Sequence, residues 1–303
     1  MKKNLISMLD VKDNLEEIID LGIKLKKKSK SGKSIELLKG KTLGMIFEKS
    51  STRTRVSFET GMTKLGGHAI FLGKSDIQLG RGETIEDTAL VLSRYVDLIM
   101  FRAMKNEDMK ELAKHATVPV ISGLDDKEHP CQVITDLMTV KEHFKKLKGL
   151  NFVYLGDGKN NMSHSYLLGC AIAGMNIKIV SPKKYWPDKY FINEAKKFKV
   201  NVEITDKVTS STDKADVIAT DTWVSMGDEK QKQERLKDFK GYTIDKKLMD
   251  KANKNAIFLH CLPAYYGYEV TKEVAHGPKS VIFDEAENRM WAQNAIMVTL
   301  SKN

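Results

Sequence analysis

Short apolar runs alternate with segments of helical hydrophobic periodicity along almost the whole chain. We predict strands over residues 43–47, 69–72, 98–101, 118–121, 152–155, 177–180, 201–204, 217–220, 257–260 and 281–283. The helical periodicity predicts helices over residues 56–65, 84–95, 106–115, 132–144 and 163–173. Strands that are separated by helices are typical of parallel, helix-covered sheets, so the pattern predicts an α/β fold.

The alternation is interrupted by one polar stretch, residues 145–149, which ends in Gly149. A first set of predicted strands precedes this stretch, and the series then restarts. A chain of 303 residues also has the length expected of about two domains. We therefore predict two domains, each a parallel β-sheet flanked by helices, over residues 1–147 and 148–286, with the helix from Gln132 as a bridge.

The formal net charge is +10, but the 40 acidic residues are mixed with the basic ones throughout. The one dense basic run, residues 24–30, ends a predicted amphipathic helix with Leu15, Ile18, Ile19 and Leu25 on its apolar face. Lysines are favoured there by the helix dipole. No aromatic residues interleave with them, so we expect a solvated helix end and no nucleic-acid partner.

The cysteine, histidine and apolar patterns exclude further classes. Cys131, Cys170 and Cys261 form no Cys-x-x-Cys pair, and an odd number argues against a disulfide framework, so we expect a cytoplasmic protein. No run of about eighteen apolar residues occurs, and no membrane span is expected. The seven histidines show no ligand spacing typical of a metal site, so we expect no metal and no other cofactor.

A cluster of hydroxyl and guanidinium groups, residues 50–55 (Ser-Ser-Thr-Arg-Thr-Arg), follows the first predicted strand, where a helix is expected to begin. The first turn of a helix has unpaired N–H groups and a positive dipole end, so it attracts anions. Arginine adds paired, charge-assisted hydrogen bonds to phosphate. By itself the cluster fits an anion site and a capped helix with solvated arginines about equally well.

Other polar segments also follow predicted strands, where parallel sheets collect their ligands. They are Arg102, residues 129–132, 156–162, 221–227 and 260–263, and, after the last predicted strand, residues 285–289. Together they place seven motifs in order along the chain: STRTR, FRA, HPCQ, an Asn-Asn pair, DTWVSMG, HCLP and AENR. In order and spacing these motifs resemble those of the ornithine carbamoyltransferases, a branch of the aspartate/ornithine carbamoyltransferase family.

The resemblance implies transfer of the carbamoyl group of carbamoyl phosphate to the δ-amino group of L-ornithine, which gives L-citrulline and phosphate. It implies a carbamoyl-phosphate domain and an ornithine domain, with a final helix from about residue 287 to 300 that returns to the first domain. We therefore assign residues 287–303 to the domain that begins at residue 1. Whether the enzyme serves arginine biosynthesis or works in the reverse, catabolic direction stays open.

The resemblance also assigns roles to residues. The residues implied to bind carbamoyl phosphate are Ser51, Thr52, Arg53, Thr54, Gln78, Arg102, His129, Pro130, Cys131, Gln132, Cys261, Leu262 and Arg289. Among them, Arg53, Arg102, His129 and Cys261 are the expected catalytic residues: the arginines where charge builds on the phosphate, His129 at the carbamoyl group and Cys261 near the attacking amine. For Cys261, a small packed residue is an equally good interpretation.

The ornithine site is implied to consist of Asp221, which faces the α-ammonium group, together with Asn161, Ser225 and Met226. An alkylamine has a pKa near 10.4, so the nucleophile must lose a proton before it attacks. Because residues 228–240 are highly polar and follow Gly227, we predict a mobile lid over ornithine. Trp223 is expected to pack in the core, and His260 to satisfy local backbone groups.

In the family, the loop that corresponds to residues 74–82 reaches a neighbouring subunit through Gln78, which implies a homotrimer with shared active sites and leaves higher assembly open. One departure is visible: many relatives carry an arginine where this chain has Tyr266. The alternatives are a carbamoyltransferase for putrescine, aspartate or an acylated ornithine, a nicotinamide-binding oxidoreductase, and a binding protein without activity. The nicotinamide fingerprint after residue 155 is incomplete, because Asn161 stands in place of its third glycine.

Overall fold

The computed structural model describes residues 3–79, 82–224 and 229–302 of the 303-residue chain. The chain divides into two compact units. Unit 1 comprises Met1–Met138 and Glu287–Asn303, and unit 2 comprises Thr139–Ala286. Within the described residues, no helix is both long and apolar enough to cross a membrane.

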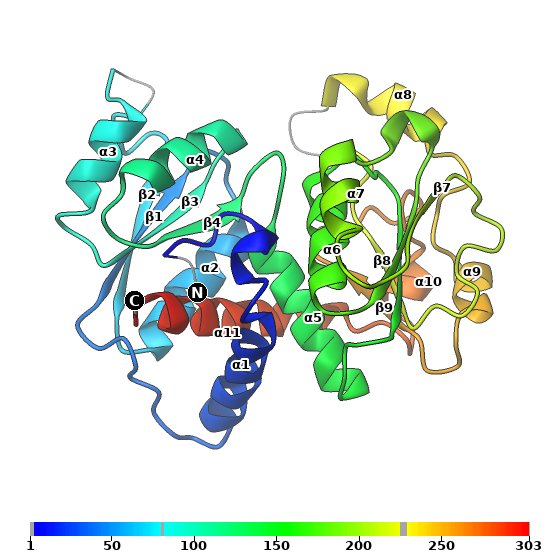
Figure 1. The fold of residues 1–303 in the computed structure, drawn as a ribbon, viewed down its shortest axis with the longest axis horizontal. Helices are drawn as coiled ribbons and strands as arrows, with labels where there is room; N and C mark the ends of the chain where they lie inside the picture. The colour runs from blue at the N-terminus through cyan, green and yellow to red at the C-terminus, as the bar shows by residue number, and fades with distance from the viewer. Residues whose placement is uncertain (1–2, 80–81, 225–228, 303) are drawn as a thin grey trace. The chain divides into compact units, whose positions relative to one another are not determined.

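Unit 1 contains a parallel four-stranded sheet in the order β2-β1-β3-β4. Its strands are β1 (Thr42–Phe47), β2 (His68–Gly73), β3 (Leu98–Arg102) and β4 (Val120–Leu124). Its helices are η1 (Met8–Val11), α1 (Leu15–Lys30), α2 (Thr52–Lys64), α3 (Ile85–Leu92), α4 (Asn106–His115) and the start of α5 (Pro130–Phe144). Right-handed crossovers place α2 on one face of this sheet and α3 and α4 on the other (Figure 1).

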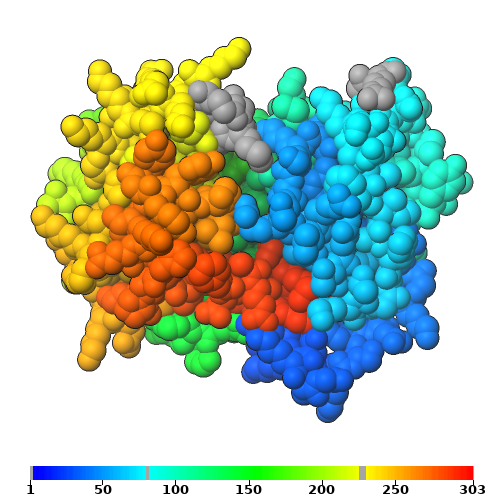
Figure 2. Space-filling model, turned by 180° about the vertical axis from the view of Figure 1, so that it is seen from behind, coloured from blue at the N-terminus to red at the C-terminus, as the bar shows by residue number. Residues whose placement is uncertain are grey.

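The last helix, α11 (Ile282–Leu300), packs on the helices of unit 1. Gly61 of α2 meets the side chains of Asn294 and Met290, and Lys26 of α1 donates a hydrogen bond to Asn288 Oδ1 at 2.7 Å. In Figure 2 the red atoms of the C-terminal helix lie beside the light-blue atoms of the segment that contains α2. The carboxyl end of the chain is therefore part of the same core as its first strand.

Unit 2 contains a parallel five-stranded sheet in the order β7-β6-β5-β8-β9. Its strands are β5 (Asn151–Leu155), β6 (Asn176–Val180), β7 (Val202–Thr205), β8 (Val217–Thr220) and β9 (Ile257–His260). The helices are α6 (Asn161–Ile172), η2 (Lys183–Tyr185), α7 (Lys189–Ala195), η3 (Glu229–Gln231), α8 (Lys232–Asp238), α9 (Lys246–Lys251) and α10 (Lys272–Ala275). Helix α6 connects β5 to β6, and α7 lies between β6 and β7 on one side of β5. Strands β8 and β9 extend the sheet on the other side of β5 (Figure 1).

Each sheet has one topological switch point, where neighbouring strands continue in opposite directions. In unit 1 it lies between β1 and β3, and in unit 2 between β5 and β8. Ligands of open parallel sheets bind at the carboxyl ends of the strands at such points. At the first switch point, Ser51 follows β1 and Arg102 is the last residue of β3; at the second, Asn160 follows β5 and Asp221 follows β8.

The parallel α/β architecture is confirmed, but the strand predicted over residues 281–283 is wrong. Ser280 makes only an isolated bridge with Phe258, and Val281 accepts a hydrogen bond from the Glu285 N–H, so the chain turns into α11 at Ile282. Phe283 is 62% exposed, which a core strand would not allow. Several other bounds move: for example, α2 starts at Thr52 instead of residue 56, β4 lies at 120–124 instead of 118–121, and α3 ends at Leu92 instead of residue 95.

Candidate active site

The start of α2 forms a capped helix N-terminus at the end of β1. Ser51 is the N-cap with extended backbone, and its Oγ accepts a hydrogen bond from the Thr54 N–H at 3.3 Å. The same hydroxyl lies 3.1 Å from Thr54 Oγ1. Only residues 48–51 separate β1 from α2, so the positive end of the helix dipole and its N–H groups lie near the switch point.

Two arginines far apart in the sequence meet at the Thr54 hydroxyl. Arg102 Nη1 and Arg289 Nη2 each lie 3.5 Å from Thr54 Oγ1. Both side chains are buried, and Thr54 is also buried. Arg289 further donates to Gln132 Oε1, and Gln132 Nε2 donates to Asp136 at 2.7 Å. Two buried guanidinium groups beside a helix N-terminus make a site for a compact, multiply charged anion.

His129 lies in this positive environment. Its Nε2 is 3.2 Å from Arg289 Nη2. A guanidinium group only donates, so Nε2 is the acceptor and the ring proton is assigned to Nδ1. Burial, and then the charges of Arg289 and Arg102, hold the pKa of His129 well below its usual range. The imidazole is therefore neutral at physiological pH and can serve as a hydrogen-bond partner without adding to the positive charge.

The two residues after His129 open α5. Pro130 is its first residue, where the missing N–H and fixed φ of proline suit a helix start. Cys131 is fully buried, and its Sγ donates to the Ser122 carbonyl at 3.3 Å. Burial raises the pKa of the Cys131 thiol to about 12. Cys131 is thus an uncharged residue that ties α5 to β4.

The remaining residues assigned to carbamoyl phosphate in unit 1 are exposed in this chain. Thr52 and Arg53 lie on the first turn of α2, and Gln78 lies on the loop between β2 and α3. Arg55, the other arginine of the cluster, is engaged elsewhere: it lies 3.8 Å over the Phe71 ring and pairs with Glu59 at 3.1 Å. The guanidinium group of Arg55 is therefore held by Phe71 and Glu59, whereas Arg53 faces solvent.

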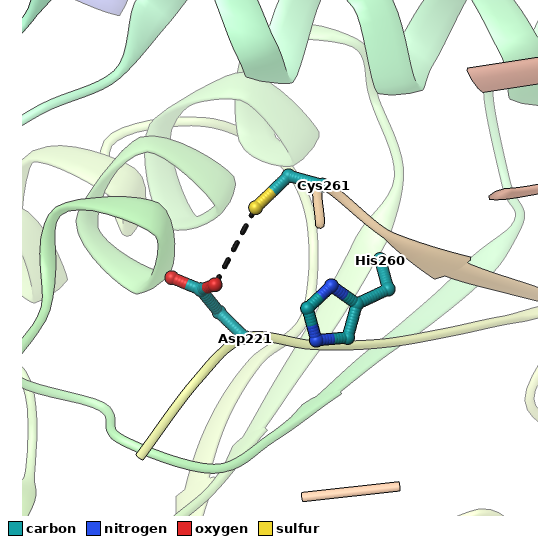
Figure 3. Close-up of side chains that lie close together, drawn as sticks. All are labelled: Asp221, His260 and Cys261. Carbon is teal, nitrogen blue, oxygen red and sulfur yellow. Dashed lines mark hydrogen bonds between the residues drawn. The ribbon is translucent and has the colours of Figure 1, made fainter. Parts of the chain in front are cut away.

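In unit 2 the switch point gathers a second set of polar groups around Asp221. The residue directly after β8, Asp221, accepts hydrogen bonds from Asn160 Nδ2 at 3.2 Å and from Cys261 Sγ at 3.4 Å. Figure 3 shows the Cys261 thiol directed at the Asp221 carboxylate, with the His260 ring beside the pair. Burial raises the pKa of Asp221, although the charge of His260 acts against this rise. A bound ammonium group would stabilise the charged carboxylate.

Cys261 and Leu262 are held by a buried pair beneath them. Leu262 N–H donates to His260 Nδ1 at 2.9 Å, and His260 Nε2 lies 3.3 Å from Glu269 Oε1. Leu262 has φ of 59°, a left-handed conformation that is uncommon outside glycine and typical of functional sites. His260 satisfies the backbone as expected, and it also fixes the turn that presents Cys261.

Asp221, His260 and Cys261 each offer one donor atom, and these atoms lie within 4.8 Å of one another. Oxygen, nitrogen and sulfur donors at such distances are of the kind that zinc accepts. In this structure, however, both ring nitrogens of His260 face other groups, Leu262 N–H and Glu269. The arrangement is therefore a hydrogen-bonded cluster whose carboxylate suits an amine.

The segment after Asp221 is fixed by a buried ion pair. Arg235 of α8 lies 2.6 Å from Asp157 Oδ2, which belongs to the loop after β5, and donates to the Trp223 carbonyl at 3.0 Å. Trp223 itself packs in the core and stacks on Phe239, as expected. Ser225 and Met226 lie outside the described residues. Residues 229–238 of the predicted lid are helical, and the motion of the lid stays a prediction.

Asn160 is the residue that sequence reasoning missed. The Asn-Asn pair was noticed, but only Asn161, the first and half-buried residue of α6, received a role. Asn160 is the N-cap: its Oδ1 accepts from Ser163 N–H at 2.8 Å, which turns its Nδ2 toward Asp221 and the Tyr154 hydroxyl. The preference of asparagine for the N-cap, three residues before a serine, was the signal that could have identified it.

Comparison with known proteins assigns both units to one protein family. A family model described as "Aspartate/ornithine carbamoyltransferase, carbamoyl-P binding domain" matches residues 3–142, and one described as "Aspartate/ornithine carbamoyltransferase, Asp/Orn binding domain" matches residues 148–300. The chain belongs to the aspartate/ornithine carbamoyltransferase family. The resemblance seen in its motifs is thus confirmed, and the chain is a carbamoyltransferase.

The relatives of this carbamoyltransferase are similar over their whole length. The "Ornithine carbamoyltransferase" of Oceanobacillus iheyensis is 54% identical over 293 residues, which are 95% of this chain and 91% of that protein. The "Ornithine carbamoyltransferase, catabolic" of Thermoplasma volcanium is 48% identical over 303 residues, or 99% and 98% of the two chains. The solved structure of the ornithine carbamoyltransferase from Pyrococcus furiosus has a TM-score of 0.93 at 45% identity, covering 97% of this chain and 95% of that one.

Proposed function

We propose that this carbamoyltransferase transfers the carbamoyl group of carbamoyl phosphate to the δ-amino group of L-ornithine, with L-citrulline and phosphate as products. The observation that carries the proposal is the convergence of Arg102 and Arg289 on Thr54 at the N-terminus of α2. Carbamoyl phosphate is an acidic mixed anhydride, and its phosphate matches this positive, buried site. The names of the full-length relatives support ornithine as the second substrate.

The phosphate would be held by the helix start and by the two buried guanidinium groups. Ser51, Thr52 and Thr54 supply hydroxyl and backbone donors, and Arg53 reaches in from the exposed first turn. The positive groups stabilise the negative charge that grows on the phosphate as the bond from the carbamoyl carbon to oxygen breaks. One prepositioned donor of this kind is worth about 3 kcal/mol of transition-state stabilisation.

The carbamoyl group would contact the loop that contains His129 and Gln132. Because His129 is neutral, its ring can hydrogen-bond the carbamoyl group without competing with Arg102 and Arg289 for the phosphate. The Leu262 carbonyl, presented by a left-handed turn, would accept from the carbamoyl NH2. Pro130 and Cys131 support this loop through the start of α5.

Ornithine would bind through Asp221, whose carboxylate pairs with its α-ammonium group, and through Asn161, Ser225 and Met226. The δ-amine attacks as a free base, forms the new C–N bond and loses its extra proton, for which the departing phosphate is a suitable acceptor. Cys261 donates to Asp221 and lies next to the Leu262 turn, so its thiol would shape the surroundings of the amine. The predicted lid would exclude water from carbamoyl phosphate.

We further propose a homotrimer in which Gln78 of one subunit reaches the site of the next. Two features of unit 1 support an interface. The edge strand β2 carries Ile70, which is 40% exposed, and α2 carries Val56, which is 53% exposed. Leu90 and Val91 of α3 are also exposed.

The free cysteines fit a cytoplasmic location, and a role in arginine biosynthesis is proposed alongside the catabolic direction named for one relative.

The decisive experiment measures citrulline from ornithine and carbamoyl phosphate, with putrescine and aspartate as competing acceptors. We expect citrulline from ornithine only. Arg289→Gln removes one buried guanidinium and should lower kcat/KM for carbamoyl phosphate by about 10²-fold or more. Arg94→Gln, an exposed arginine in the same unit, is the matched control. Unchanged activity in Arg289→Gln, or carbamoylation of putrescine at the rate of ornithine, would contradict the proposal.

A further inference from the structure

A buried acid, Glu128, lies directly before His129. Its residue is 4% exposed, and its Oε2 accepts a hydrogen bond from the Met8 N–H at 2.8 Å, across 120 residues of sequence. Acids are seldom fully buried unless they are paired. The position of this one, between the N-terminal segment and the proposed carbamoyl-phosphate site, calls for an explanation.

The N-terminal segment is a fixed partner for Glu128. Leu5 makes a bridge with Ile121 of β4: its N–H donates to Val120 O at 2.9 Å and its carbonyl accepts from Ser122 N–H at 2.8 Å. Met8, the first residue of η1, is fully buried. Ser7 caps η1 in a capping box with Asp10. The N-terminal segment thus pairs with β4 through Leu5, and its Met8 lies beside the loop 125–128.

The other side of the loop is clamped by Asp125. Its Oδ1 accepts from the N–H groups of Lys127 and Glu128, both at 2.8 Å, and its Oδ2 accepts from Asn106 Nδ2 at 2.9 Å. The Asp125 N–H donates to the Glu128 carbonyl at 3.1 Å. That carbonyl belongs to the peptide bond that leads into His129. Glu128 is therefore held at its N–H, its carbonyl and its side chain, and this fixes the backbone from which His129 projects.

The charges around Glu128 favour an uncharged acid. Two other acids, Asp125 of its own loop and Asp10 of η1, lie close enough to disfavour a negative charge on Glu128. Burial, followed by these acids, raises the pKa of Glu128 to about 8, although the Met8 N–H and Ser7 act against the rise. Near neutral pH the group is the neutral carboxylic acid, and glutamine has the same shape and can accept the same hydrogen bond.

We propose that Glu128 is a positioning residue for the carbamoyl transfer: through its hydrogen bond to the Met8 N–H, it anchors the His129 loop to the N-terminal segment. The inference rests on the proposed function. It adds a long-range contact to the site, since neither Glu128 nor Met8 is expected to touch substrate. The N-terminal segment then acts in catalysis through the geometry of His129.

Two pairs of variants test this contact. Glu128→Ala removes the acceptor, whereas Glu128→Gln keeps it. Met8→Ala and Met8→Pro both remove the buried side chain, but only proline removes the N–H. Proline is tolerated there because Met8 is the first residue of η1 and Ser7 has extended backbone, with φ of −142° and ψ of 155°. Glu107→Ala, an exposed acid on α4, controls for the loss of a negative charge.

We expect Glu128→Ala and Met8→Pro to raise KM for carbamoyl phosphate by about tenfold, the scale of an orphaned buried hydrogen-bonding group. KM for ornithine should change far less. Glu128→Gln, Met8→Ala and Glu107→Ala should keep KM for carbamoyl phosphate within about twofold of the wild-type value, even where stability falls.

The inference is overturned if Met8→Pro and Met8→Ala have the same KM for carbamoyl phosphate, or if Glu128→Gln behaves as Glu128→Ala does. A loss that appears only in kcat, with the KM values of both substrates unchanged, indicates a smaller fraction of folded enzyme and also overturns it. If the wild type forms no citrulline, the proposed function itself fails. Binding of inorganic phosphate by calorimetry then measures whether the same two variants weaken the anion site.

Discussion

Replacing Glu128 by glutamine should make the protein more stable, and by an amount that grows with pH. In the folded chain the pKa of Glu128 is raised from 4.5 to about 8 by burial. Between these values the folded state holds a proton that the unfolded state has released, so folding is opposed more strongly as pH rises. One pKa unit corresponds to about 1.36 kcal/mol, so the cost reaches about 5 kcal/mol at pH 8 and then stays constant.

The measurement is urea or thermal unfolding of the wild type and of Glu128→Gln at several pH values from 5 to 9. Every other titrating group is common to the two proteins and cancels in their difference. The advantage of the glutamine variant should be small near pH 5, should increase up to about pH 8 and should then level off. Glu107→Gln, at an exposed position, should show no such trend. A difference that is independent of pH would refute the buried, protonated state of Glu128.

Three further predictions concern the two half-sites. His129→Gln should lower kcat by about 10²-fold, the effect of one misplaced donor. The pKa of His129 is held well below its usual range, so the wild-type kcat should show no titration of this group between pH 6 and 8. Asp221→Asn should raise KM for ornithine at least tenfold and leave KM for carbamoyl phosphate nearly unchanged, as initial rates will show. Arg235→Gln removes the guanidinium group that pairs with the buried carboxylate of Asp157 and should destabilise the protein by about 3–5 kcal/mol in urea unfolding, a loss that Asp157→Asn in the same chain should partly restore.

Local features of the sequence predicted the cluster of polar residues from which the proposed carbamoyl-phosphate site is built. Ser51 to Thr54 are consecutive, so a helix start that carries hydroxyl and guanidinium groups can be expected from one short stretch, although the hydrophobic periodicity predicts the helix only from residue 56. The parallel sheets followed from the alternation of apolar strands and helices in the same way. Residues 281–283 were misread because three apolar residues in a row do not distinguish a strand from the first turn of a buried helix.

Contacts between distant residues could not be derived from local pattern. Arg102 and Arg289 lie 48 and 235 positions from Thr54, and nothing in the chain near any of them shows that all three meet at one hydroxyl. Nothing near Glu128 in the sequence indicates that this acid is buried, because its contact with the Met8 N–H joins residues 120 positions apart. The choice of Asn160 over Asn161 as the partner of Asp221 depends on the backbone angles of a helix cap.

The split of unit 1 across the chain has a consequence for biosynthesis of the protein. Unit 2 is one continuous stretch, Thr139–Ala286, and all of its strands have been synthesised before the ribosome reaches α11. Arg289, by contrast, belongs to the last segment of unit 1, Glu287–Asn303. Domains generally fold as units while the chain emerges. A nascent or truncated chain that lacks α11 therefore has the Ser51 cap and Arg102 but lacks Arg289, so the proposed phosphate site is complete only once α11 has been synthesised.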